Sequence, residues 1–391
     1  MTRLQPLAAY DLSPSRGFLS SFELDEVPLP AAFDPVLEAA EMLSDLLTSG
    51  RVRHWLAALP LPPVEAFAAR ADEVEVRAAM VRYSFLVQAY VWGDATPPAG
   101  LPANLAVPIA AIAERLGQAP LLPYSGYVLD NWSRIDKAGP IALDNIYMVQ
   151  HFLGGTDESW FVLIHVAIEA EAGRALALAT DLVAAADAGD GGRVITGLRD
   201  MDDVWTRVNA IFDRMPERCD PYIYFHRVRP YIHGWKNNPA LGDGLVYDGV
   251  ARFAGRPQAF RGQTGSQSSI VPAMDALFGI AHDADPLRTF LEELHQYRPP
   301  AHRRFIEDLA AASGLRGFVQ TAGDPAMTAA FNACVDQVAR FRSRHLEYAA
   351  QYINRQAAGG AGNDPDVGTG GTPFMKYLKK HRDENRAQQI G

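Results

Sequence analysis

Two histidines of this 391-residue chain stand on apolar helical stripes, where an imidazole can do chemistry. His165 lies in WFVLIHVAIE (160–169), with no polar side chain between it and Glu169. His345 lies in FNACVDQVARFRSRHLEYAAQYI, where apolar side chains recur three and four residues apart. A buried polar group without a partner costs on the order of 1–3 kcal/mol. Each histidine therefore either makes an ordinary buried hydrogen bond or has a chemical role, which would be to bind a metal ion, transfer a proton or contact a substrate.

Among metal centres, this pattern favours haem over zinc. Helical proteins bind haem through a histidine on a helix, and haem needs apolar surroundings. The zinc motif HExxH is absent, and Cys219 and Cys334 are too few for a cysteine-rich zinc site. A single histidine on an apolar stripe is more often a structural hydrogen-bonding residue, but two of them in long helices of one protein favour a haem site.

The elements that must position these residues are helices. Apolar residues recur with helical spacing at 33–48, 64–92, 104–116, 160–187, 199–213, 286–296, 303–312 and 326–353. Alternating β-branched runs are nearly absent, so we predict an all-α fold. Irregular segments are expected at 93–103, 229–273 and 357–373, which are rich in Gly and Pro.

Composition narrows the function classes. The formal net charge of −10, without a basic tract, argues against nucleic acid as a partner. No apolar run approaches the ~20 residues of a membrane span, and no signal-peptide pattern opens the chain. With only two cysteines, a disulfide framework is excluded. We expect a cytoplasmic protein that contacts neither membrane nor nucleic acid.

Long strings of the sequence resemble the indoleamine 2,3-dioxygenase family. In the second half they are GWKNNPALGDGLVYDGV (234–250), FRGQTGSQSSIVPAMDALFGI (260–280), RPPAHRRFIEDL (298–309), FRSRHLEYAAQYI (341–353) and GTGGTPFMKYLK (368–379). In the first half, SRGFLS (15–20), QAYVWG (88–93), LAVPIAAIAERLG (105–117) and YVLDNW (127–132) follow in the family's order. The resemblance covers nearly the whole chain.

This resemblance implies a small N-terminal helical domain, residues 1–150, that caps a larger haem-binding domain, residues 151–391. It implies haem b as the cofactor, with His345 as the iron ligand and O2 as co-substrate. Asp275 and Arg342 match a carboxylate–arginine pair beside the ligand helix. A purely structural ion pair is an equally good interpretation of these two residues.

On the substrate side, the resemblance implies an aromatic pocket with a carboxylate-binding arginine. Arg229 would pair with the amino-acid carboxylate, because a guanidinium matches its planar geometry. The matching aromatic positions are Tyr124, Phe161, Tyr224 and Phe225. Thr369, in the Gly-rich loop GTGGT, would contact the amino acid, although a plain linker has the same composition. Small and polar residues would lie close to the haem face: Gly262, Thr264, Gly265 and Ser266.

His165 departs from the family pattern, because animal members carry a serine there. A distal histidine is known from the related tryptophan 2,3-dioxygenases, where it binds the indole N–H. The implied function is haem-dependent insertion of both atoms of O2 across the indole C2=C3 bond of L-tryptophan, giving N-formylkynurenine. Two alternatives remain open, namely a haem enzyme for another indole and a non-catalytic haem or oxygen sensor. We expect a monomer whose partner is a small-molecule indole.

Overall fold

The computed structural model describes residues 4–281, 286–357, 380, 384 and 387–391. Its helices are α1 (Asp34–Glu41), α2 (Leu43–Thr48), α3 (Val52–Ala57), α4 (Val64–Arg70), α5 (Glu73–Trp92), α6 (Ala103–Leu116), α7 (Thr156–Asp187), α8 (Gly191–Phe212), α9 (Pro221–Ile223), α10 (Ile270–Phe278), α11 (Pro286–His295), α12 (Pro300–Ala312), α13 (Leu315–Ala322), α14 (Pro325–Ala349) and α15 (Arg355–Ala357). The strands are β1 (Gly100–Leu101), β2 (Trp132–Arg134), β3 (Ile146–Met148) and β4 (Val246–Tyr247). The predicted all-α class is confirmed.

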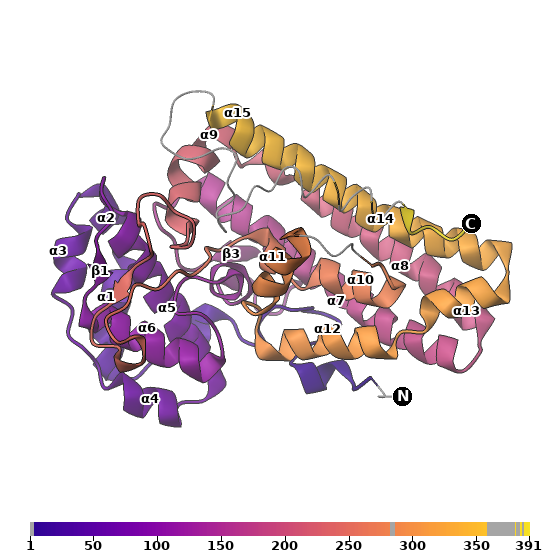
Figure 1. Cartoon of the computed structure of the whole chain (residues 1–391), viewed down its shortest axis with the longest axis horizontal. Coiled ribbons are helices and arrows are strands. Elements are labelled where there is room, and N and C mark those ends of the chain that lie inside the picture. Colours follow the sequence, from indigo (N-terminus) through magenta and orange to yellow (C-terminus); the bar gives the residue numbers. More distant parts are fainter. Residues whose placement is uncertain (1–3, 282–285, 358–379, 381–383, 385–386) are drawn as a thin grey trace.

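Three long helices, α7, α8 and α14, lie side by side and form the frame of the molecule (Figure 1). Aromatic rings join α8 to α14. Phe212 stacks on Phe341 with ring centroids 4.6 Å apart, and Trp205 meets the same ring edge-on. Asp190 caps α8 by accepting the backbone N–H of Arg193, and Asp324 caps α14 by accepting two backbone N–H groups of the first turn. Within the described residues, no helix is both long and apolar enough to cross a membrane.

Helices α1 to α6 gather at one end of the molecule around α5 (Figure 1). A capping box between Asp72 and Glu75 starts α5, which is buried on almost all sides. The N-cap residue Asp72 has an extended backbone, so a continuous helix cannot pass through it. The predicted helix 64–92 is therefore divided into α4 and α5. The division into domains near residue 150 stays a prediction.

Two predicted irregular segments meet through a small parallel sheet. Strand β1, from 93–103, pairs with β4, from 229–273. A second contact within 229–273 depends on Gly234, where a Cβ atom would lie 2.0 Å from the backbone nitrogen of Gly262. The backbone N–H groups of Trp235 and Lys236 donate to the carbonyl of Phe260. These contacts fix the course of the chain into residues 262–268.

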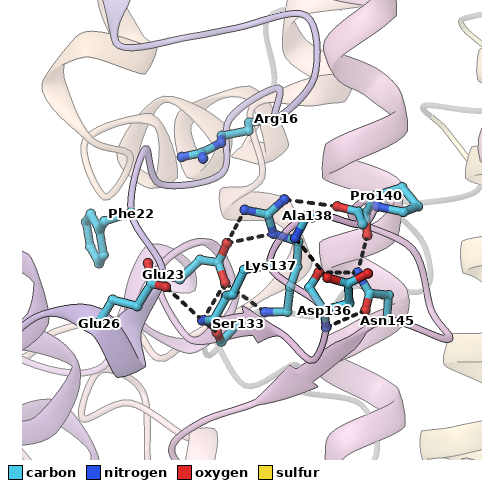
Figure 2. Close-up of polar contacts among 12 residues, drawn as sticks. Arg16, Phe22, Glu23, Glu26, Ser133, Asp136, Lys137, Ala138, Pro140 and Asn145 are labelled. Atoms are coloured by element: carbon cyan, nitrogen blue, oxygen red, sulfur yellow. Dashed lines mark hydrogen bonds and ion pairs between the residues drawn. The ribbon is translucent and has the colours of Figure 1, made fainter.

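A buried carboxylate ties the β2–β3 hairpin to the N-terminal segment (Figure 2). Glu23 accepts hydrogen bonds from Ser133, from Lys137 and from both the backbone and the guanidinium of Arg134. Burial alone would raise the pKa of Glu23, but these bonds lower it to about 2. We call this group of residues the Glu23 clasp.

Several helix boundaries differ from the predicted ones. The segment 33–48 divides at Met42, and α8 begins at Gly191 instead of near residue 199. Helices α3 and α13 were not predicted, because each spans only about two turns and its periodicity is too short to recognise.

Candidate functional site

Two neighbouring pockets, called the small and the large lobe of one cavity below, share lining residues from α7, α14 and residues 262–268. The small lobe has a volume of about 130 Å³ and the large lobe about 690 Å³. Both lobes are lined by His165, Phe212, Gly265, Ser266 and His345. The structure therefore brings the two histidines singled out by sequence to one space. A wider cleft of about 1630 Å³ on another face of α7 contains none of the predicted site residues.

His345 projects from α14 into both lobes. Burial, with a smaller contribution from the charge of His165, lowers the pKa of His345 to about 4. Its imidazole is therefore neutral at pH 7. No hydrogen bond to this ring occurs among the described residues, and its nearest aromatic neighbour is Phe212, at 6.5 Å between ring centroids. A neutral imidazole without such a bond keeps a lone pair for a metal ion.

His165 differs because one of its ring nitrogens is already bonded. Its Nδ1 lies 2.7 Å from the carbonyl oxygen of Phe161, one turn earlier on α7. A carbonyl only accepts, so Nδ1 must carry the proton, and Nε2 of the neutral ring is then an acceptor. Burial lowers the pKa of His165, against a smaller effect of the Phe161 bond, and this favours the neutral form.

Aromatic rings surround His165 at the small lobe. The ring of Phe161 lies 4.7 Å from the imidazole, and the ring of Tyr224 lies 4.8 Å from Phe161. Tyr224 belongs to a π-helical turn, η6 (Tyr224–Val228), which directs it into the lobe. Burial raises the pKa of its hydroxyl, which stays protonated at neutral pH.

Phe225 and Arg229 lie deeper than predicted. Both are fully buried, and neither lines a lobe. The guanidinium carbon of Arg229 lies 5.4 Å from the centre of the Phe225 ring. The positive charge of Arg229 nevertheless acts on the nearby Tyr224 hydroxyl and favours its ionised form. The predicted pairing of Arg229 with a substrate carboxylate stays a prediction.

Asp275 and Arg342 form the predicted ion pair at the large lobe. Their bidentate bonds measure 3.1 and 2.6 Å, and they join α10 to α14 three residues before His345. Both side chains are largely buried. A planar, two-bond contact of this kind fixes the orientation of both side chains.

Residues 262–266 contribute the small-residue wall of the cavity. Thr264, Gly265 and Ser266 line it, whereas Gly262 packs against Gly234 and does not. Arg298, which was not predicted from sequence, anchors this wall. Its guanidinium donates to the carbonyl oxygens of Ser266 at 2.8 Å and Ser268 at 3.1 Å.

A second unpredicted residue, Glu169, partners the predicted Tyr124. The Tyr124 hydroxyl and the Ser268 hydroxyl both donate to Glu169 Oε1, each at 2.9 Å. Burial raises the pKa of Glu169 to about 7, and the two hydrogen bonds oppose this rise only in part. The sequence could have indicated Glu169 through its spacing, because it follows His165 by four residues and therefore lies on the same face of the helix. Thr369 and the GTGGT loop lie outside the described residues.

The sequence matches the family model described as "Indoleamine 2,3-dioxygenase" over residues 6–388. The chain is 32% identical to indoleamine 2,3-dioxygenase 1 of Rattus norvegicus, over 97% of this chain and 95% of that protein. It is 31% identical to indoleamine 2,3-dioxygenase 2 of Homo sapiens, over 97% and 94% respectively. Its identity to indoleamine 2,3-dioxygenase of Saccharomyces cerevisiae is 28%, over 99% and 95%.

Proposed function

Because the chain belongs to the indoleamine 2,3-dioxygenase family and is an enzyme of that family, we propose that its substrate is L-tryptophan. Both atoms of O2 are inserted across the C2=C3 bond of the indole, and the product is N-formyl-L-kynurenine. The observation that carries this proposal is one cavity lined by two neutral imidazoles. One of them is free to bind iron and the other to accept a hydrogen bond.

We propose haem b as the cofactor and His345 as the residue that would hold its iron. Three features of the cavity fit this group. The imidazole is neutral, it lines both lobes, and a Cβ atom at Gly265 would meet nothing within 4 Å, which leaves space beside the backbone for a large ligand. Bound haem would supply O2 activation, which amino-acid side chains do not provide. Asp275 and Arg342 would then orient the helix that carries His345.

His165 would position the substrate. With the proton on Nδ1, its Nε2 can accept a hydrogen bond from the indole N–H. Such a bond fixes the orientation of the indole ring and withdraws no proton from it, because the lowered pKa of His165 makes the imidazole a weak base. The rings of Phe161 and Tyr224 would form the aromatic walls of this subsite.

The amino-acid part of the substrate would be held by Arg229 and Thr369. Arg229 follows Tyr224 by five residues and acts electrostatically on its hydroxyl, so it stands close to the small lobe. Pairing with a carboxylate would require the side chain to reach the lobe when substrate binds. The difference in affinity between L-tryptophan and tryptamine, which lacks the carboxylate, measures this contact.

The experiment that tests the proposal is turnover by the reduced, haem-loaded protein in air. We expect L-tryptophan to yield N-formyl-L-kynurenine, detected by its absorbance and mass. Full haem occupancy without product from L-tryptophan would contradict the proposed substrate. Product from another indole alone would instead support the alternative enzyme.

A further inference from the structure

Glu169 carries a buried oxygen atom that no described residue satisfies. Its carboxyl group is fully buried and lines the large lobe. Oε1 accepts two hydrogen bonds, from Tyr124 and Ser268, whereas Oε2 has no hydrogen-bond partner among the described residues. Buried polar atoms are almost always hydrogen-bonded, so this oxygen needs a partner that the described residues do not supply, either water or a group of a bound ligand.

The hydrogen bonds also determine where a proton on Glu169 resides. Both lone-pair directions of Oε1 are used by hydroxyl donors, so the acid carries its proton on Oε2. The protonated side chain is thus a hydrogen-bond donor at the lobe. Its pKa of about 7, raised by burial, means that this form is well populated at neutral pH.

The charged groups around the large lobe leave this form undisturbed. Arg342 is paired with Asp275, Arg298 donates to backbone carbonyls, and Arg288 is paired with Glu292.

The histidines of the lobe do not change this. His165 and His345 are neutral at pH 7, and His295 contacts Arg298 and Glu307. Among the described residues, no lysine or arginine forms an ion pair with Glu169, so no cation holds it in the ionised state.

We propose that protonated Glu169 donates a hydrogen bond from Oε2 to a carboxylate of the molecule held in the large lobe. This inference rests on the proposed function, because the carboxylate belongs either to a haem propionate or to the amino-acid substrate. An O–H donor to a carboxylate forms a short, strong bond. An ionised Glu169 would instead place two negative charges side by side.

The sign of the pH dependence follows from this arrangement. Binding of the carboxylate is strongest where Glu169 keeps its proton, below about pH 7, and weakens as the pH rises above that value. Between pH 6 and pH 8.5 we expect the affinity to fall about 30-fold, because the protonated fraction of a single group with a pKa of about 7 falls from about 0.9 to about 0.03.

The test is a haem titration of the haem-free protein, followed by the Soret absorbance between these pH values. If the carboxylate belongs to haem, the affinity of the wild type for haem falls between pH 6 and pH 8.5, and we call this fall the pH step. Haem dimethyl ester, which has no free carboxylate, shows no pH step. The variant Glu169→Gln, whose amide donates at every pH, binds haem tightly without the step. Glu171→Gln is the matched control, because Glu171 lies on the same helix in a surface ion pair with Arg207, and it keeps the step.

A substrate carboxylate is distinguished in the haem-loaded protein. Haem affinity is then flat with pH, whereas L-tryptophan affinity shows the step, and tryptamine affinity does not. Absence of the step for both ligands overturns the inference, as does a step that persists in Glu169→Gln. An affinity that rises with pH also overturns it, because ionised Glu169 would then bind a cation.

A second readout is independent of ligand affinity. In infrared spectra at pH 7, the haem-loaded wild type shows a carbonyl band of a protonated carboxyl group that is missing from Glu169→Gln. If the spectra do not differ in this band, Glu169 is ionised and the inference fails. The comparison of haem with its dimethyl ester uses only the native chain and stands even if the variant misfolds. A protein that binds no haem at all would overturn the proposed function and this inference together.

Discussion

At the scale of single residues, the cavity depends on which ring nitrogen of each histidine is available. His165 uses Nδ1 in a bond to the helix backbone, and its Nε2 remains an acceptor. His345 has no such bond among the described residues, and burial lowers its pKa to about 4. Two imidazoles with similar surroundings therefore suit different partners, an N–H donor for His165 and a metal ion for His345.

Replacing His345 tests the ligand assignment. We expect His345→Ala to lose stable haem binding, because the other described histidines that line the cavity, His165 and His295, already make hydrogen bonds through their rings. The measurement is the Soret absorbance after haem loading and gel filtration. His54→Ala, at an exposed position, is the control and should load as wild type does. A normal spectrum for His345→Ala would refute the assignment.

Replacing His165 tests its role as acceptor. Wild type should bind L-tryptophan about 5- to 10-fold more tightly than 1-methyl-L-tryptophan, which lacks the N–H, since a net hydrogen bond contributes about 1 kcal/mol. In His165→Phe this preference should disappear, and His165→Gln, whose amide oxygen still accepts, should recover part of it. Equal discrimination in wild type and His165→Phe would mean that His165 has only a structural role.

Sequence predicted the two histidines because helical periodicity alone decides which residues face the core. It could not predict the environment of Glu169, whose partners Tyr124 and Ser268 are far away along the chain. Arg298 was missed for the same reason. The depth of Arg229 was also unpredictable, because a π-helical turn rotates the residues that follow it.

At the scale of elements, long helices were predictable and the short connections between them were not. The expected helix at 104–116 agrees with α6 to within one residue, because a left-handed Gly117 ends it. The β2–β3 hairpin, in contrast, is held by the Glu23 clasp, and Glu23 precedes the hairpin by more than a hundred residues. No local pattern reveals such a contact.

The Glu23 clasp predicts an acid-sensitive stability. In the folded protein the pKa of Glu23 is lowered from about 4.5 to about 2. Ionised Glu23 therefore stabilises the fold fully above pH 4.5, and this stabilisation is lost as the pH falls toward 2. Glu23→Gln should therefore lower the free energy of unfolding by about 2 kcal/mol at pH 7. In denaturant melts, the difference in stability between wild type and variant should be clearly smaller at pH 3 than at pH 7.

The control for this experiment is Glu26→Gln. Glu26 is exposed and lies 3.3 Å from Lys137, so its loss should change stability by less than about 0.5 kcal/mol. A difference between wild type and Glu23→Gln that stays constant with pH would show that the ionised form of Glu23 does not stabilise the clasp.

At the scale of the whole molecule, the N-terminal segment rests directly on the helix that carries the site. A Cβ atom at Gly173 of α7 would lie 2.6 Å from the backbone nitrogen of Gly17 and 2.7 Å from the carbonyl of Pro14. Such a distance requires the backbone itself to move. The glycine at 173 thus permits a contact that joins residues 13–17 to α7, one turn beyond Glu169.

We expect Gly173→Ala to destabilise the protein by about 1–3 kcal/mol, although alanine favours helix formation, because overpacking against backbone outweighs that preference. Gly192→Ala, near the start of α8, is the control. Its Cβ would meet only Asp190 Oδ1, at 3.6 Å, so the change should be neutral or slightly stabilising. Thermal melts compare the two, and equal stability for both variants would contradict this packing.

The most direct test of the account is an isotope measurement on the intact enzyme. Haem-loaded, reduced protein is supplied with L-tryptophan under 18O2, and the mass of the product is measured by mass spectrometry. We predict N-formyl-L-kynurenine that carries two labelled oxygen atoms, and a rate that collapses in His345→Ala. A product with one labelled atom, or no product despite full haem occupancy, would contradict the proposed dioxygenation of L-tryptophan.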